Sequence, residues 1–190
     1  MTDIQMRGYV LLSAAEYLRA SAGEKRANDL LAGASPALRG ALSTASSASW
    51  CKAEHHAEMF HLIASLAGGD DEKAKDLLIA CGKAAAHEAS NTFLRLLMKV
   101  LTPTLFAKKL PDIWARDCTG ATVTVEVHEE KIRNRLSGVG GFDHIAPVAV
   151  GYVLFALEAM GKKITRVDLH EWSLATPGPD KPWFEIHWAA

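Results

Sequence analysis

The sequence predicts an α+β fold, in which a helical N-terminal half packs on a C-terminal β-β-α-β-β antiparallel sheet module. Three observations support this prediction. Apolar residues recur at helical spacing as far as about residue 117. From residue 118 onward the apolar residues alternate with polar ones, as they do in strands. A single apolar helix separates the strands, and helices and strands that are segregated along a chain are typical of α+β proteins.

The length and composition indicate one domain. The chain has 190 residues, and we expect residues 1–190 to form a single domain with a helical half, 1–117, and an α+β half, 118–190. Hydrophobic residues make up 49% of the chain and charged residues 23%, which is enough apolar material for a buried core. The net charge of −1 lacks the basic excess of proteins that bind nucleic acid or anionic membranes, so we expect neither partner.

The helical half contains recognisable helix starts. In "ASPALRGAL", Ser35 is a capping residue and Pro36 occupies the first helical position. We expect a further helix over "WCKAEHHAEMFHLI". The acids of "GGDDEK" favour the start of a long helix that continues to about Leu101. Thr102-Pro103 then begins a shorter helix, and "KLPDIWARD" adds one or two more turns.

In the second half of the chain, apolar and polar residues alternate. "GATVTVEVHEE" and "KIRNRLSG" predict a hairpin, and Asp143 is a plausible cap for a helix over residues 144–160, which Gly161 ends. "KKITRVDLHEWSL" and "WFEIHW" predict a second hairpin around the turn "ATPGPDKP". In the last strand the even-numbered residues are expected to face the core: Phe184, Ile186 and Trp188.

Two groups of residues have metal-ligand chemistry. Cys51, His55 and Glu58 share one edge of the expected helix, and their side chains all suit zinc, but no CxxC or HExxH signature accompanies them. On the last two strands His170 and His187 are expected to face outward and opposite each other, beside Asp168 and Glu185. An ordinary polar surface is the alternative in both places, and we predict no metal.

His56 differs because it falls on the apolar face of its helix, with Phe60 nearby. A buried neutral imidazole needs a hydrogen-bond partner. It is therefore either a satisfied core histidine or a polar anchor inside a ligand cavity.

The segment 144–160 is apolar nearly all round, so protein must enclose it on most sides. Gly151 lies in its middle, where glycine costs about 0.5–1 kcal/mol relative to alanine. Either a neighbouring helix or a ligand must approach closely there. If a cavity exists, Gly151, Tyr152 and Phe155 are candidates for its wall.

No motif indicates an enzyme: the chain lacks a phosphate-binding loop, a nucleophile elbow and a recognisable activated cysteine. Three cysteines indicate free thiols in a reducing compartment. With no expected signal peptide or membrane span, we expect a cytoplasmic protein.

The stretch "LTPTLFAKKLPDIWARDCTGATVTVEV", the apolar helix and the terminal "WFEIHW" together resemble the haem-NO-binding and vinyl-reductase-like superfamily. The chain is more closely similar to a bacterial family that is abundant as paralogues in myxobacteria. The residues that carry this similarity are Trp50, Phe60, Thr102-Pro103, Leu110-Pro111 and Trp114.

The resemblance implies a cavity between the helical half and the sheet. In haem-binding members a histidine near the end of the "LPDIW"-like segment ligates iron, and a Tyr-x-Ser-x-Arg motif holds the propionates. Here that position holds Trp114 and the motif does not occur, so we expect no cofactor. Other members bind small hydrophobic molecules or serve as assembly subunits.

Two functions follow as expectations. The first is a non-catalytic small-molecule-binding or sensory domain with an apolar pocket and a small apolar ligand. Its candidate pocket residues are His56, Phe60, Trp114, Gly151, Tyr152 and Phe155. The alternative is a protein-interaction or assembly subunit that forms a homodimer or binds a protein partner and has no ligand.

Overall fold

The helices gather at the N-terminal end of the chain and the main sheet at the C-terminal end, so the α+β prediction is confirmed. The computed structural model describes residues 4–90, 98, 101–140, 142, 144–170, 172–174 and 181–189. The described helices are α1 Gly8–Ala22, α2 Glu24–Gly33, α3 Pro36–Thr44, α4 Ala53–Ser65, α5 Asp71–Ala89, α7 Pro103–Asp117 and α8 Ile145–Ala159. The strands are β1 Gln5–Arg7, β2 Trp50–Lys52, β3 Cys118–Thr119, β4 Thr122–His128, β5 Lys131–Ser137, β6 Ile164–His170 and β7 Trp183–Trp188.

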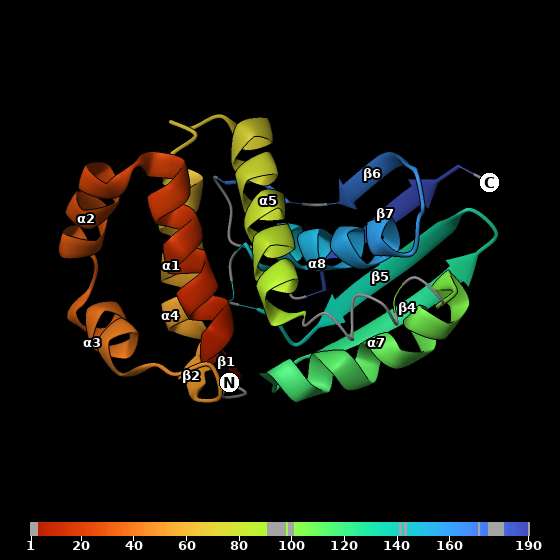
Figure 1. Cartoon of the computed structure of the whole chain (residues 1–190), viewed down its shortest axis with the longest axis horizontal. Helices are drawn as coiled ribbons and strands as arrows, with labels where there is room; N and C mark the ends of the chain where they lie inside the picture. The colour runs from red at the N-terminus through yellow and green to blue at the C-terminus, as the bar shows by residue number, and fades with distance from the viewer. Residues whose placement is uncertain are drawn as a thin grey trace.

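Figure 1 shows α1 to α4 on one side of the molecule and the larger sheet on the other, with α5 between them. Helix α8 runs from behind α5 toward the sheet, and α7 lies along β4. The junction of α5 and α8 is the most extensive helix–helix contact. The two halves therefore meet along α8, most of whose residues are buried.

The main sheet has the order β4-β5-β7-β6 and is antiparallel throughout. Its β4–β5 hairpin matches the prediction. The inward side of β7 was also correctly predicted, since Phe184, Ile186 and Trp188 are all buried. Of the predicted turn "ATPGPDKP", residues 175–180 lie outside the described residues.

A second, three-stranded sheet with the order β2-β1-β3 was not predicted. Met6 is its centre and pairs with Cys51 on one side and Cys118 on the other. The prediction that the helix begins at Trp50 was therefore wrong, because Trp50–Lys52 is a strand and α4 begins at Ala53. Strands of two or three residues are too short to show a period, so only the pairing of distant segments defines them.

Two helix boundaries also differ from the prediction. Helix α5 ends at Ala89 rather than near Leu101, and residues 91–97, 99 and 100 lie outside the described residues. Helix α7 is one helix that continues through Pro111. A proline inside a helix removes one backbone hydrogen bond, but buried contacts of Phe106 and Leu110 on the preceding turns hold the helix against its neighbours.

Side chains cap the helix at three of the predicted starts, and Ser35 is the cap that was predicted there. The hydroxyl of Ser35 accepts from the amide of Leu38, the carboxylate of Asp70 from the amide of Lys73, and the hydroxyl of Thr102 from the amide of Leu105. Asp143, the expected cap of α8, lies outside the described residues. Among the described residues no helix combines the length and the apolar run that crossing a bilayer requires.

Candidate functional site

An apolar cavity lies where the helical half meets the sheet. Its volume is about 70 Å³, roughly half that of an engineered cavity of about 150 Å³ that binds benzene. Helices α1, α7 and α8 and strands β1, β3, β4, β5 and β7 all contribute to its wall. Its apolar lining includes Val10, Leu110, Val123, Leu136, Val148 and Phe184.

One end of the wall carries polar groups that bind one another. The hydroxyl of Tyr9 donates to Asp117 Oδ2 at 3.1 Å, and Arg116 donates to the same carboxylate at 2.7 Å. Burial, and next the negative charge of Asp117, raise the pKa of Tyr9 to about 12, so this phenol stays protonated. Burial also raises the pKa of Tyr152, whose hydroxyl is buried close to Tyr9. The carboxylate of Asp117 is therefore neutralised where it lines the cavity.

Besides the hydroxyl of Tyr152, the described wall contains a second unpaired polar side chain, that of Asn134. It is fully buried, and neither its amide nitrogen nor its amide oxygen has a hydrogen-bond partner among the described residues. It points to the inner side of β5 between Ile132 and Leu136, which are equally buried. Leaving a buried polar group unpaired costs about 1–3 kcal/mol. An apolar residue would avoid that cost, so this amide needs an explanation beyond packing.

Two of the six residues predicted for a pocket line this cavity, Trp114 and Tyr152. Trp114 is fixed in place because its indole N–H donates to the carbonyl oxygen of Ala121 at 3.1 Å. Whether either residue binds a ligand stays a prediction. Asn134 was not among the predicted residues, although its signal was present: it is the one polar side chain at an inward position of "KIRNRL".

Gly151 lies outside the cavity lining, at the crossing of α8 with α5. A Cβ on Gly151 would lie 2.2 Å from the carbonyl oxygen of Ile79, and one on Gly82 would lie 2.1 Å from that of Val148. The structure therefore favours the helix-packing explanation for this glycine. Phe155, one turn further along α8, packs edge-on against His87 of α5 with ring centroids 5.9 Å apart.

His56 and Phe60 lie in a separate aromatic cluster inside the helical half. The ring centroid of Phe142 is 6.3 Å from that of His56 and 6.1 Å from that of Phe60. The imidazole nitrogens lie 3.1 Å from the carbonyl oxygen of Lys52 and 3.4 Å from that of Arg7. Burial lowers the pKa of His56 to about 4. His56 is therefore a neutral core histidine, whose single N–H can donate to one of these two carbonyl oxygens.

The predicted edge of Cys51, His55 and Glu58 does not form one site. Cys51 belongs to β2 rather than to the helix. Both oxygens of Glu58 are occupied, since the backbone N–H and the hydroxyl of Ser35 each donate to it at 2.6 Å. Glu58 thus helps to hold the start of α3.

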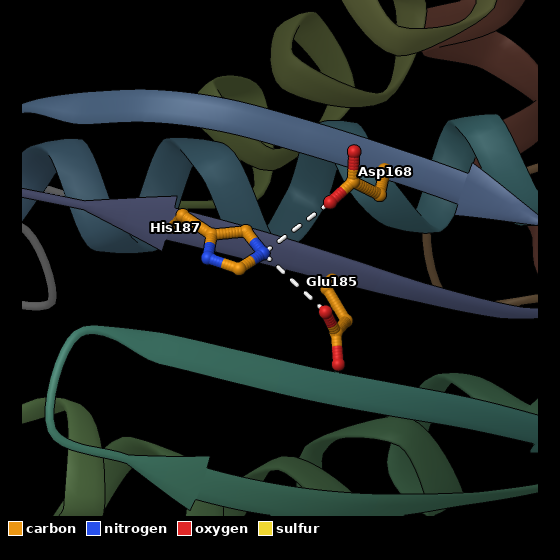
Figure 2. Close-up of side chains that lie close together, drawn as sticks. All are labelled: Asp168, Glu185 and His187. Carbon is orange, nitrogen blue, oxygen red and sulfur yellow. Dashed lines mark ion pairs between the residues drawn. The ribbon is translucent and has the colours of Figure 1, made fainter.

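A second ligand-type group is found on the outer face of the main sheet. Asp168, Glu185 and His187 place one ligand atom each within 4.8 Å of one another, and they are the sole group of three that does so in the described part of the chain. Figure 2 shows His187 Nε2 between the two carboxylates, at 3.3 Å from an oxygen of each. The expectation that His170 faces His187 was wrong, because Trp183 lies opposite His170.

Cations already occupy these carboxylates. Lys131 and Arg133 lie 3.1 and 2.7 Å from one oxygen of Glu185, and Arg166 lies 2.8 Å from Asp168. Burial by itself raises the pKa of Glu185, but the hydrogen bonds and charges of Lys131 and Arg133 outweigh burial and bring it down to about 2. A metal ion would have to displace three positive side chains, so the group has the character of an ion-pair network that links β5, β7 and β6.

Comparison with solved structures shows that the fold is H-NOX-like. An H-NOX protein from S. oneidensis in the Fe(II)NO ligation state superposes with a TM-score of 0.68 at 15% identity, covering 97% of this chain and 100% of that one. An Fe(II) unliganded H-NOX protein from K. algicida gives 0.72 at 11% identity, covering 97% of each chain.

An oxygen-binding H-NOX domain related to soluble guanylate cyclases gives 0.59 at 10% identity, covering 97% of this chain and 96% of that one. At such identities the likeness shows the fold alone. No protein-family model matches the sequence, and no curated protein matches it significantly.

The described residues of the cavity do not fit haem. Haem iron in proteins is held by histidine, thiolate, methionine or tyrosinate ligands. No histidine is among the described lining residues. Burial, followed by the charge of Asp117, raises the pKa values of Tyr9 and of the Cys118 thiol to about 12, and burial also raises that of Tyr152, so none of the three is an anion at neutral pH. Met6 is the one remaining ligand type in the described lining. Asp117, held by Tyr9 and Arg116, is the one charged residue in this lining, so no described lining residue offers a positive charge to the propionates. A volume of about 70 Å³ also lies far below the roughly 300–1,000 Å³ of ordinary ligand pockets.

Proposed function

We propose that this chain is a non-catalytic small-molecule-binding domain of the H-NOX fold, which takes a compact, uncharged and mainly apolar ligand in the cavity and does not use haem. The observation that carries the proposal is the apolar cavity between α1, α7, α8 and the sheet. Its size suits a ligand of about three to five non-hydrogen atoms, judged against the benzene-sized cavity above. Three buried free cysteines support a reducing, cytoplasmic location.

The position of the cavity supports a sensory role. Its wall joins the first helix, α7 and α8 to three strands of the main sheet, so a ligand there contacts both halves of the chain at once. A ligand can shift a conformational equilibrium only through contacts that differ between two states. A molecule bound between two packed halves is placed to make such contacts.

Xenon tests the proposal, because it is compact and enters dry apolar cavities. We expect xenon to shift the backbone amide resonances of Val148 and Val153, which line the cavity from α8. Ala149→Leu adds three carbon atoms from the same wall and should abolish the shifts. The matched control is Ala84→Leu on the exposed side of α5, which should leave them unchanged.

Absence of any xenon response in the wild-type protein, or an undiminished response in Ala149→Leu, would overturn the proposal. The alternative of an assembly subunit then becomes the better explanation. Native mass spectrometry distinguishes it, since a ligand-free dimer is expected for an assembly subunit and a monomer that retains a small molecule for a binding domain.

A further inference from the structure

We infer that the ligand of this cavity carries one carboxamide group, which pairs with the side chain of Asn134. This inference rests on the proposed binding function and specifies the chemistry of the ligand. It starts from the observation that Asn134 lines the cavity while both polar atoms of its side chain lack a partner among the described residues.

The position of Asn134 prevents its own strand from satisfying it. On β5 its neighbours along the inner side are Ile132 and Leu136, and its cross-strand partners are Val125 and Phe184. None of these four side chains has a polar atom. The amide therefore faces apolar groups on its own sheet, and a partner has to come from the space on the inner side of the sheet.

The chemistry of a primary amide determines what that partner should be. Asn offers a carbonyl oxygen that accepts and an NH₂ group that donates, side by side in one plane. A complementary ligand therefore needs an adjacent donor and acceptor, as in a carboxamide. A ketone could use only the NH₂ group and would leave the oxygen unpaired. A hydrocarbon would leave both atoms unpaired.

Charge excludes the ionised alternative. A carboxylic acid has the same shape, but at neutral pH it is an anion, and burying an anion without a cation is costly. The described lining contains no Lys or Arg, and its one charged residue is Asp117, whose carboxylate is held by Tyr9 and Arg116. A neutral amide meets no such penalty.

Three compounds of one shape test the inference: propionamide, which donates and accepts; 2-butanone, which only accepts; and 2-methyl-1-butene, which does neither. Titration of the ¹⁵N-labelled protein, followed through the cavity-lining amides and the Asn134 side-chain NH₂, measures each affinity. We expect propionamide to bind about tenfold or more tightly than the hydrocarbon, with the ketone between them.

Asn134→Leu supplies the reverse measurement, since leucine has nearly the same shape without polar atoms. In this variant propionamide should lose about tenfold or more in affinity while 2-methyl-1-butene gains. The matched control is Asn28→Leu, which makes the same change at an exposed asparagine of α2 and should alter nothing. The comparison of the three compounds on the wild-type protein does not depend on either variant folding.

The outcomes separate this inference from the proposed function. If none of the three compounds binds either protein, both the binding function and this inference fail. If 2-methyl-1-butene binds the wild-type protein as tightly as propionamide, or Asn134→Leu leaves the preference unchanged, the cavity binds ligands but the amide inference is wrong. Ordered water that stays on Asn134 in the presence of propionamide would also overturn it.

Discussion

Gly151→Ala should destabilise the protein, although alanine is normally the better helix former. The added Cβ would lie 2.2 Å from the carbonyl oxygen of Ile79, 2.7 Å from the amide nitrogen of Lys83 and 2.9 Å from the carbonyl carbon of Gly82. All three atoms belong to the backbone of α5, so no side chain can rotate away. To restore an ordinary distance between this Cβ and the backbone of α5, the two helices must move apart by roughly 1 Å where they cross.

Two opposing effects set the change in the free energy of unfolding. Overpacking of a core costs about 1–3 kcal/mol and sometimes more, and the fixed backbone places this site at the upper end or above it. Alanine returns up to about 1 kcal/mol of helix propensity. The net expectation is a loss of about 2–3 kcal/mol, which lowers the melting temperature by roughly 4–12 °C for a chain of this length.

Urea denaturation followed by circular dichroism measures the free energy of unfolding, with Gly40→Ala as the matched control. Gly40 lies inside α3 with open space where its Cβ would be, so alanine there should stabilise by about 0.5–1 kcal/mol. If Gly151→Ala is as stable as wild type or as stabilising as Gly40→Ala, α5 does not press against this glycine, and the space beside Gly151 is open as a ligand cavity would require.

Four further predictions concern the sheet and the cavity. Asn134→Leu should raise the free energy of unfolding of the ligand-free protein by about 1–3 kcal/mol, because it removes two unpaired buried atoms; a loss in urea denaturation would mean that the amide has a partner. Trp188→Ala should cost about 3–5 kcal/mol, whereas His187→Ala should cost about 1 kcal/mol or less; similar urea midpoints would contradict the register of β7. Since the folded pKa of Glu185 is about 2, below its ordinary 4.5, its stabilising contribution is complete above about pH 5 and is lost as the pH falls toward 2. Glu185→Gln should therefore weaken the dependence of the urea midpoint on pH in that range, and an unchanged dependence would argue against the ion pairs. The purified protein should show no Soret band after haem titration and gel filtration, and a stoichiometric band would mean that the cavity accepts haem.

The sequence alone predicted those helices and strands that are long enough to show a repeating pattern of apolar residues. The alternation of Val123, Val125 and Val127 identified β4, and the segment 144–160, which is apolar nearly all round, identified α8 as an enclosed helix. The inward side of β7 followed from the same logic, because a strand with one buried face must alternate. These features depend on neighbours along the chain, and the chain displays them directly.

Only the tertiary structure decided the features that depend on distant partners. Strands β1 and β2 exist because Met6 pairs with both Cys51 and Cys118, and no local pattern reports such pairing. The sequence left two explanations open for Gly151, and the backbone of α5 that lies against it decides between them.

In the candidate site, too, the sequence determines which way a side chain faces and the tertiary structure determines its neighbours. The sequence places Asn134 on the inner side of a strand, but only the fold shows that the groups across from it are apolar and that a cavity adjoins it. Likewise, ligand-type residues are visible in the sequence, whereas the cations that neutralise Glu185 come from β5, which the fold pairs with β7. Periodicity decides which side a residue faces, and the packing of segments far apart in the chain decides what it meets there.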